Sequence, residues 1–184
     1  MRRELVVRAQ SGDREAFDAI AAALYDQLYS VGRRILRDGH AAEDAVQEAL
    51  IRAWRDLRSL REPERLEAWM HRLLVRACYD QVRRRRPFEV TIRPIDVGRS
   101  DPADDIAVVA HRDELERAFL KLSVEQRAVL VLTHYVGMPA AEVGHVLGIP
   151  VGTVHSRLHY AIQTMRTTLA SAAPDDRALR ELGQ

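Results

Sequence analysis

The sequence predicts an all-α protein made of two small helical domains joined by a flexible linker, the second of which contains a helix-turn-helix. Three observations support this fold class. Apolar residues recur at steps of three and four through the first part of the chain. Prolines, glycine and aspartates interrupt that pattern between residues 87 and 112. A short helical pattern, a glycine turn and a longer helical pattern then follow from residue 140.

The first domain is expected to cover residues 1–86. Its first long helix should end at Asp38-Gly39, because glycine readily adopts the left-handed conformation that closes a helix. A second helix should run through Arg55 and a third from about Glu67 to Arg85. The stripe expected to face the core consists of Phe17, Ile20, Leu24, Leu28, Val31 and Ile35.

Residues 87–112 form the predicted linker, which is acidic and in which the helical periodicity of apolar residues is lost. As a flexible coil of about 25 residues it would reach roughly 25–30 Å. Fully extended, it could approach about 85 Å. We therefore expect a joint that can connect two domains at separate places. The residues that break periodicity are Pro87, Pro94, Gly98, Ser100, Asp101, Pro102, Asp104 and Asp105.

The second domain is expected at residues 113–170, followed by a tail (171–184) to which we assign no role. Its helical pattern restarts with Leu115, Phe119 and Leu122. Ser123 and Gln126 have the spacing of a capping box, in which each side chain bonds the backbone of the other residue. The helix that follows should continue through Tyr135 and end near Gly137.

A helix-turn-helix is predicted after Pro139, with a short helix from Ala140 to Leu147, a turn at Gly148-Ile149 and a longer helix from about Val151. On the longer helix, Val154, Leu158, Ala161 and Met165 fall on one face, which should pack inward. The polar face is typical of a helix that reads DNA, although a structural helical hairpin is the alternative. Its residues are Thr153, His155, Ser156, Arg157, His159 and Tyr160.

An acidic helix is predicted at residues 41–54. Asp44, Gln47, Glu48 and Ile51 should project together, while its alanines and Val46 face the core. A mixed acidic and apolar face complements a basic helical protein partner, and an ordinary solvated face is the alternative.

The bulk composition argues against several classes of protein. The 28 basic and 27 acidic residues give a net charge of only +1, but the first 86 residues hold 18 Arg against 14 Asp and Glu. The single Cys78 excludes an internal disulfide, and the seven histidines lack metal-site spacing. We expect no metal, no cofactor, no membrane insertion and a cytoplasmic location.

His40 with Asp44 and Glu48 could be imagined as an acid-base cluster, but no nucleophile motif or phosphate loop accompanies them, so we expect no enzyme.

From about Val7 to Leu169 the chain resembles a bacterial extracytoplasmic-function sigma factor of the sigma-70 family. Several widely spaced motifs in the family's order carry this resemblance. They are Ser11-Gly12-Asp13 with Ala16-Phe17, Ala42-Glu43-Asp44-Ala45-Val46-Gln47-Glu48 with Trp54, Ala68-Trp69 with Arg72 and Asp80, the run Arg83–Arg86, and Gly152-Thr153-Val154-His155-Ser156-Arg157-Leu158.

The resemblance implies two domains, regions 2 and 4, which bind core RNA polymerase and two promoter elements. It implies polymerase binding by Asp44, Gln47, Glu48 and Ile51, and minus-thirty-five binding by the polar face of the helix-turn-helix. It also implies regulation by an anti-sigma protein that masks both domains. The residues implied for the minus-ten element are Arg58, Ser59, Arg61, Arg65, Trp69, Arg72, Arg76, Arg83 and Arg84.

Some positions keep other interpretations open. An indole such as Trp69 is more often a core residue than a stacking surface, and the Arg83–Arg86 run could be a solvated helix end. His155 and Tyr160 stand where relatives often carry lysine and arginine, and Arg76 where many carry asparagine. The competing function is a repressor or activator that binds duplex DNA unaided.

Overall fold

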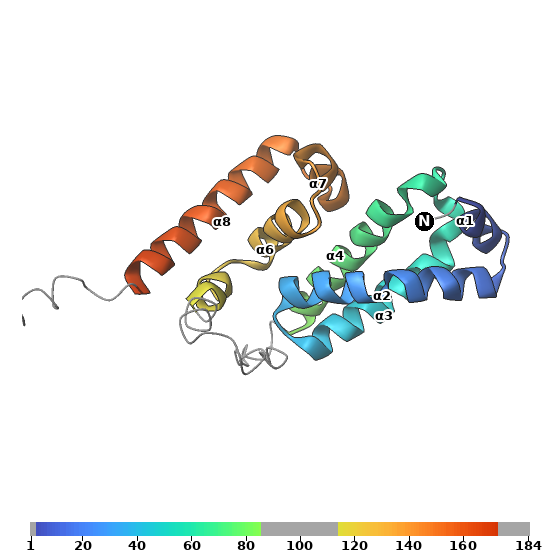
Figure 1. Cartoon of the computed structure of the whole chain (residues 1–184), viewed down its shortest axis with the longest axis horizontal. Helices are drawn as coiled ribbons and strands as arrows, with labels where there is room; N and C mark the ends of the chain where they lie inside the picture. The colour runs from blue at the N-terminus through green and yellow to red at the C-terminus, as the bar shows by residue number, and fades with distance from the viewer. Residues whose placement is uncertain (1–2, 86–113, 173–184) are drawn as a thin grey trace, which may run out of the picture.

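The computed structural model describes residues 3–85 and 114–172 (Figure 1). Regular structure in both ranges is entirely helical, and it forms two helical domains, which confirms the predicted fold class. The predicted linker and the tail beyond residue 172 lie outside the described residues.

Six elements form the first domain. They are α1 (Arg3–Gln10), α2 (Arg14–Leu36), α3 (Gly39–Asp56), the short 3-10 turns η1 (Leu57–Ser59) and η2 (Pro63–Arg65), and α4 (Leu66–Arg85). The predicted apolar stripe of α2 is buried, with Ile20, Val31 and Ile35 fully so. Asp13 caps α2 by accepting a hydrogen bond of 3.0 Å from the Ala16 backbone nitrogen. The local signals for these helices therefore agree with their packing.

The junction between α2 and α3 differs from the prediction. Arg37, not Gly39, takes the left-handed conformation, with φ of 61°. Asp38 then caps α3 by accepting a hydrogen bond of 2.9 Å from the Ala41 nitrogen, so Gly39 already belongs to α3. An aspartate one residue before the glycine is a strong N-cap, and the left-handed residue therefore lies two positions earlier than the glycine alone suggests.

The second domain comprises a helical segment at 114–120, α6 (Val124–Leu130), η3 (Val131–Tyr135), α7 (Ala140–Leu147) and α8 (Val151–Ala172). The capping box of Ser123 and Gln126 is confirmed, with hydrogen bonds of 2.9 and 3.2 Å between side chain and backbone. The helix-turn-helix is also confirmed, with Gly148 left-handed at φ of 68°. Contrary to the prediction of one α-helix, η3 is a π-helical turn, in which the Val136 nitrogen donates to the Val131 carbonyl at 3.0 Å.

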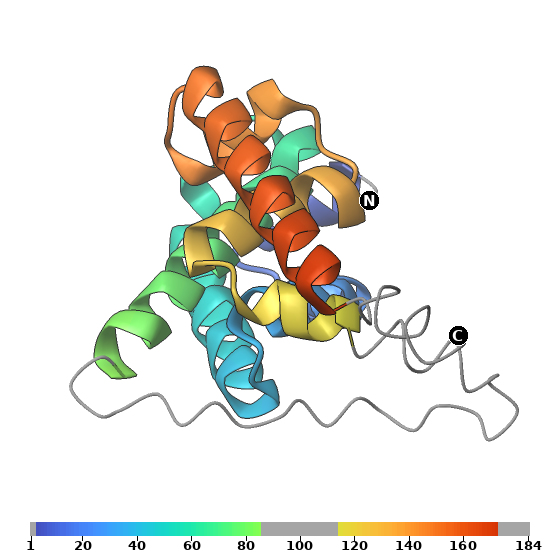
Figure 2. The same ribbon diagram turned by 90° about the vertical axis from the view of Figure 1, so that its left-hand side faces the viewer.

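The two domains pack against each other around one continuous apolar core. Helix α4 lies against α6 and α7, and α2 lies against α6 and η3 (Figures 1 and 2). The sequence did not predict this contact. It places α4, which carries most of the predicted minus-ten residues, between the rest of the first domain and the helix-turn-helix.

Candidate functional site

The outer face of α3 presents the residues predicted to bind polymerase. Asp44, Gln47 and Ile51 are exposed, with Ile51 at 54% of its full accessible area. The opposite face of the same helix is fully buried against α2 and α4, as predicted. These buried residues are Ala42, Ala45, Val46, Ala49 and Ala53.

Glu48 is less available than its neighbours on this face. Its carboxylate is half-buried and accepts a hydrogen bond of 2.8 Å from the Arg52 guanidinium. The same guanidinium donates to Asp80 on α4 at 3.0 Å, and Asp80 also accepts from Arg83. Although burial opposes the shift, the hydrogen bonds from Arg83 and Arg52 lower the pKa of Asp80. Glu48 therefore belongs to a network that ties α3 to α4.

An apolar hollow of about 460 Å³ adjoins Ile51 on the α3 face. Trp54, which is 44% exposed, packs on Phe17 with ring centres 5.0 Å apart. Leu50 and Ala21 also line the hollow. Sequence reasoning did not assign Trp54 or Phe17 to this site. The exposed large apolar residues at i, i+3 spacing on an otherwise polar face were the available signal.

The segment from η1 to η2 displays four of the residues predicted to bind the minus-ten element. Arg58, Ser59, Arg61 and Arg65 are all exposed. The Gln10 side chain holds this segment in place by donating to the Leu57 and Leu60 carbonyls at 3.1 and 2.6 Å. Arg65 pairs with Glu62 at 2.6 Å. The loop is thus fixed from α1, while its arginines face solvent.

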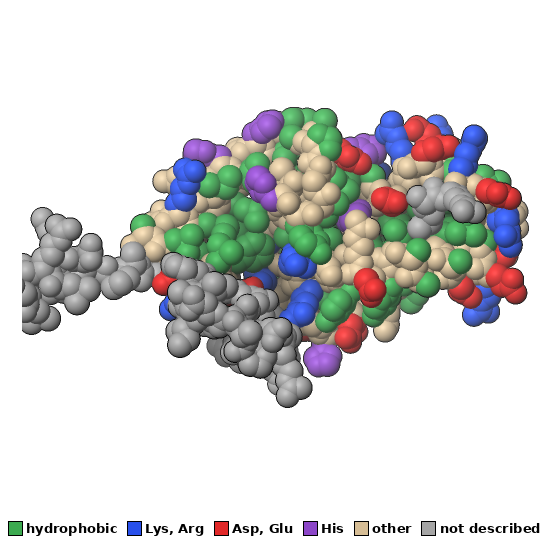
Figure 3. All heavy atoms as spheres, viewed as in Figure 1, with side chains coloured by type: hydrophobic (Ala, Val, Ile, Leu, Met, Phe, Trp, Pro, Cys, Tyr) green, Lys and Arg blue, Asp and Glu red, His purple; other side chains and the backbone are tan. Residues whose placement is uncertain are grey.

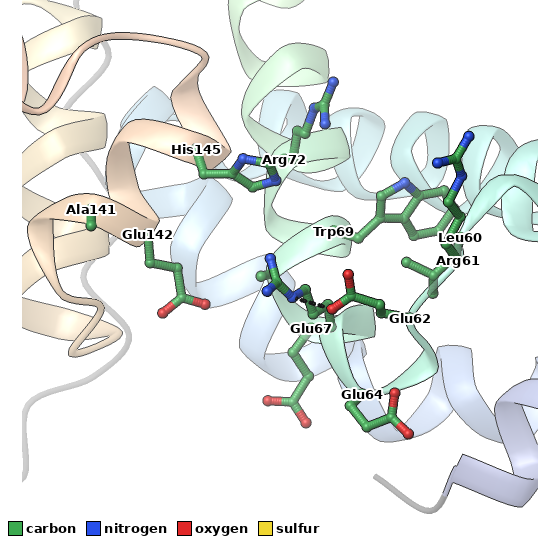
Figure 4. A pocket seen from close by; sticks show the side chains of 12 residues that line it. Leu60, Arg61, Glu62, Glu64, Glu67, Trp69, Arg72, Ala141, Glu142 and His145 are labelled. Carbon is green, nitrogen blue, oxygen red and sulfur yellow. Dashed lines mark ion pairs between the residues drawn. The ribbon is translucent and has the colours of Figure 1, made fainter.

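A cavity of about 780 Å³ lies between this loop, the start of α4 and helix α7 (Figure 4). Trp69 and Arg72 line it from α4, and Glu142 and His145 line it from α7. Figure 4 shows His145 extending from α7 towards Arg72. Trp69 is half-buried: part of its side chain packs against the apolar core, and another part lines the cavity.

Farther along α4, the remaining predicted minus-ten residues point outward. Arg83 and Arg84 lie near the end of the helix and Arg76 lies two turns before them, and all three are exposed to solvent in part or in full. Arg76 and Arg83 border a second cavity, of about 440 Å³, which Val124 and Glu125 of the second domain also line. The predicted minus-ten residues therefore form one surface along η1, η2 and α4, and the second domain lies beside part of it.

Helix α8 presents to solvent most of the residues predicted to bind the minus-thirty-five element. His155, Ser156, His159 and Tyr160 are exposed, whereas Thr153 and Arg157 are half-buried. Val154 and Ala161 are fully buried on the opposite face, as predicted. In the view of Figure 3, Lys, Arg, Asp and Glu side chains crowd the end of the molecule at α1, whereas over α7 and α8 the charged side chains are few and histidines are scattered among apolar and uncharged atoms. This part of the surface can hydrogen-bond to bases and phosphates but carries little fixed positive charge.

Two buried groups on α4 have shifted pKa values that follow from their surroundings. Burial raises the pKa of the Cys78 thiol to about 12, which leaves it protonated and unreactive at neutral pH. Burial lowers the pKa of His71, whose Nδ1 donates to the Glu67 carbonyl at 2.8 Å. Among residues 3–85 and 114–172, no group of three or more His, Cys, Asp or Glu side chains is placed to hold a metal ion. None of the described helices is long and apolar enough to cross a membrane.

Both domains match family models. Residues 20–88 match the model of sigma-70 region 2, and residues 112–165 match that of sigma-70, region 4. These matches overlie the α2–α4 unit and the helix-turn-helix unit described above.

Individual relatives cover most of the chain. The ECF RNA polymerase sigma factor SigM of Mycobacterium tuberculosis is 33% identical over 161 residues, which is 84% of this chain and 77% of the relative. SigL of the same species is 34% identical over 168 residues, or 86% of this chain and 94% of the relative. SigW of Bacillus subtilis is 28% identical over 181 residues, or 92% and 97% of the two chains.

Two solved structures share the fold. CnrH, in complex with the cytosolic domain of CnrY, superposes with a TM-score of 0.67 at 26% identity and covers 93% of this chain and 98% of its own. The sigma factor RpoE of Bartonella quintana, in complex with the anti-sigma factor NepR, superposes with a TM-score of 0.64 at 23% identity and covers 85% and 98%.

Proposed function

This chain belongs to the extracytoplasmic-function sigma factors of the sigma-70 family, and we propose that it acts through three separate surfaces of its two domains. It is an alternative sigma factor, which binds core RNA polymerase, recognises promoter elements and promotes transcription initiation. We place region 2 at residues 1–86 and region 4 at 113–170. Its function rests on binding rather than catalysis, and it works with the polymerase in the cytoplasm.

The α3 face is the proposed polymerase-binding surface. Asp44, Gln47 and Ile51 project from one side of a helix whose other side is fully buried, and the hollow beside Trp54 extends this face with apolar area. An exposed apolar patch with an acidic rim fits a helical partner that carries basic residues. This combination on one rigid helix is the observation that supports the assignment most directly. Glu48 contributes mainly through its network with Arg52.

The minus-ten surface runs along η1, η2 and α4, and the minus-thirty-five surface along the start of α8. The first offers exposed arginines for phosphates beside the half-buried indole of Trp69. Such a combination suits a single strand with an unstacked base, because a cavity and nearby cations offset the cost of extracting it. The second offers short polar side chains at the N-terminal end of a recognition helix.

An anti-sigma protein is the proposed regulatory partner. CnrH, which is 26% identical to this chain over nearly its full length, was solved in complex with the cytosolic domain of CnrY. The exposed apolar hollow and the cavity between the domains offer surfaces that such a protein could cover.

The polymerase assignment is tested with Asp44→Arg and the matched control Glu43→Arg. Both residues are exposed on α3, but they lie about 100° apart around the helix. We expect Asp44→Arg to weaken binding to sigma-free core polymerase about tenfold, equivalent to ~1.4 kcal/mol, and Glu43→Arg to change it less than about twofold. Equal losses for the two variants would remove the face-specific assignment.

Transcription from a promoter library tests the function as a whole. Initiation should require both the protein and the core polymerase. Specific duplex binding by the free protein, without binding to the polymerase, would instead identify a stand-alone regulator.

A further inference from the structure

We propose that region 4 of the free protein closes over helix α4 and covers part of the minus-ten surface, held there in part by contacts of the end of α2 with the helical segment 114–120 and with η3. This inference rests on the proposed function, because that function assigns α4 to promoter binding. It goes further by making the free protein self-inhibited.

The residues covered are those that would otherwise meet DNA. Trp69 and Arg72 share their cavity with Glu142 and His145 of α7. Arg76 and Arg83 share theirs with Glu125, at the first turn of α6. Carboxylate oxygens accept hydrogen bonds from arginine, as phosphate oxygens do. Region 4 therefore places acidic side chains beside the arginines that the minus-ten strand would need.

An ion pair between a buried arginine and a half-buried glutamate joins the two regions. Arg37, at the end of α2, pairs with Glu116 on the helical segment 114–120. The Arg37 side chain is only 9% exposed, and its guanidinium also lies 5.4 Å from the ring centre of Phe119. Burial, followed by repulsion from Arg127, Arg33 and Arg34, lowers the pKa of Arg37 to about 10, so it remains charged at neutral pH. Removing Glu116 would leave this buried charge without its carboxylate partner.

A second contact involves the π-helical turn. The Arg34 guanidinium lies 3.8 Å from the ring centre of Tyr135, which is a cation–π distance. Tyr135 is the last residue of η3, and the wider turn changes the direction in which it projects compared with a regular α-helix. The π-helical turn is therefore one of the elements of region 4 that contact region 2.

These two contacts are polar, and they add to the apolar core that is continuous between the two regions. None of the four residues in these two contacts is among the residues proposed to bind DNA or polymerase. Substitutions there can change closure without touching a proposed binding residue. We call the four residues Arg34, Arg37, Glu116 and Tyr135 the latch.

The distance between the regions tests closure in the full-length protein. Cysteines introduced at Ala23 on α2 and Thr167 on α8 would carry spin labels, since both positions are exposed. Cys78 can stay, because it is fully buried and its thiol is protonated. Pulsed electron paramagnetic resonance measures the distance between the two labels, and with the wild-type latch this distance should be short and narrowly distributed. In Glu116→Arg it should become longer and broader.

Two variants control for charge. The swap Arg37→Glu with Glu116→Arg keeps the net charge and should restore the short distance. Asp26→Arg changes the charge by the same amount as Glu116→Arg, at an exposed site on α2, and should leave the distance unchanged. Tyr135→Leu removes the second contact without changing the charge. It therefore tests closure independently if Glu116→Arg does not fold.

Binding of a fluorescein-labelled single-stranded oligonucleotide supplies a second readout. We expect Glu116→Arg to bind it about five- to tenfold more tightly than Asp26→Arg does. A broad wild-type distance distribution, or equal DNA affinities for these two variants, would overturn the proposal. If distances respond to the latch but no variant initiates transcription with core polymerase, closure stands and the proposed function fails. If the protein initiates transcription but the distances do not respond to the latch, the proposed function stands and closure fails.

Discussion

Arg52 on α3 donates a hydrogen bond of 3.0 Å to Asp80 on α4, and this bond joins the helix proposed to bind polymerase to the helix proposed to bind the minus-ten strand. Arg52 also bonds Glu48, and Arg83 also bonds Asp80, so the chain of contacts reaches a predicted residue on each surface. The two surfaces of region 2 are thus fixed relative to each other by polar contacts as well as by the core.

Replacing Asp80 with asparagine should lower the free energy of unfolding by about 1 kcal/mol, because the half-buried Arg52 loses an ionic partner. Hydrogen bonds lower the pKa of Asp80, so its contribution is complete above its ordinary value of 3.8 and is lost as the pH falls through the folded-state value. Urea unfolding at pH 7 and in acid would measure both effects. Asp56→Asn, at the exposed end of α3, should change stability by less than about 0.5 kcal/mol.

His71 makes stability depend on pH in the neutral range. Its Nδ1 must carry the proton to donate to the Glu67 carbonyl, and its Nε2 is buried with no hydrogen-bond partner among the described residues. Protonating Nε2 would bury an unsatisfied donor and a charge, so burial lowers the pKa below its ordinary value of 6.5. The unfolded chain then binds more protons than the folded protein as the pH falls below 6.5.

Between pH 7.5 and 5.5 this residue alone should therefore reduce the free energy of unfolding by up to about 1 kcal/mol. In His71→Leu that part of the pH dependence should disappear, whereas replacing the exposed His134 should leave it intact. Urea titrations at the two pH values measure the difference. An unchanged slope in His71→Leu would show that other groups cause the pH dependence.

Local sequence signals predicted most of the helices. The bounds of α7 agree with the prediction because Pro139 precedes it and Gly148 closes it, and both signals act within one turn. The capping box at Ser123 likewise needs only residues three apart. At the end of α2 two local signals competed, and the Asp38 cap placed the left-handed residue at Arg37.

The contact between the regions could not be read from the sequence. It depends on pairs such as Arg37 with Glu116 and Arg34 with Tyr135, which are far apart in the chain and follow no periodic pattern. The same limit applies to the candidate site. Helical spacing correctly placed Asp44, Gln47 and Ile51 on one exposed face. It could not show that Glu48 is hydrogen-bonded to Arg52, because Arg52 is held by Asp80 on another helix.

Tyr160→Arg should increase the salt dependence of duplex DNA binding. Tyr160 is 63% exposed on the proposed recognition helix, and we expect a cation at this position to reach a phosphate of the bound duplex. Each new phosphate contact should steepen the plot of log affinity against log salt by about 0.9. Thr167→Arg adds the same charge two turns farther along α8 and should change the slope much less. Fluorescence anisotropy over a series of salt concentrations gives both slopes, and equal slopes would contradict the placement of Tyr160 at the DNA.

Gly144→Ala should disrupt the helix-turn-helix. A Cβ atom at Gly144 would lie 2.9 Å from the Ile149 carbonyl oxygen, closer than two such atoms can approach. The Ile149 nitrogen donates to the Gly144 carbonyl at 3.0 Å, so the backbone of the turn cannot move away without loosening that bond. We expect a loss of about 1–3 kcal/mol in the free energy of unfolding, since forced overpacking typically costs this much.

Gly152→Ala is the matched control. It makes the same chemical change within the first turn of α8, where an added Cβ meets no atom within 4 Å. Alanine has the higher helix propensity, so this variant should be neutral or more stable by up to about 1 kcal/mol. Thermal and urea unfolding, followed by helical circular dichroism, would compare the pair. If the two variants had equal stability, the close approach between α7 and the turn could not be what requires glycine at residue 144.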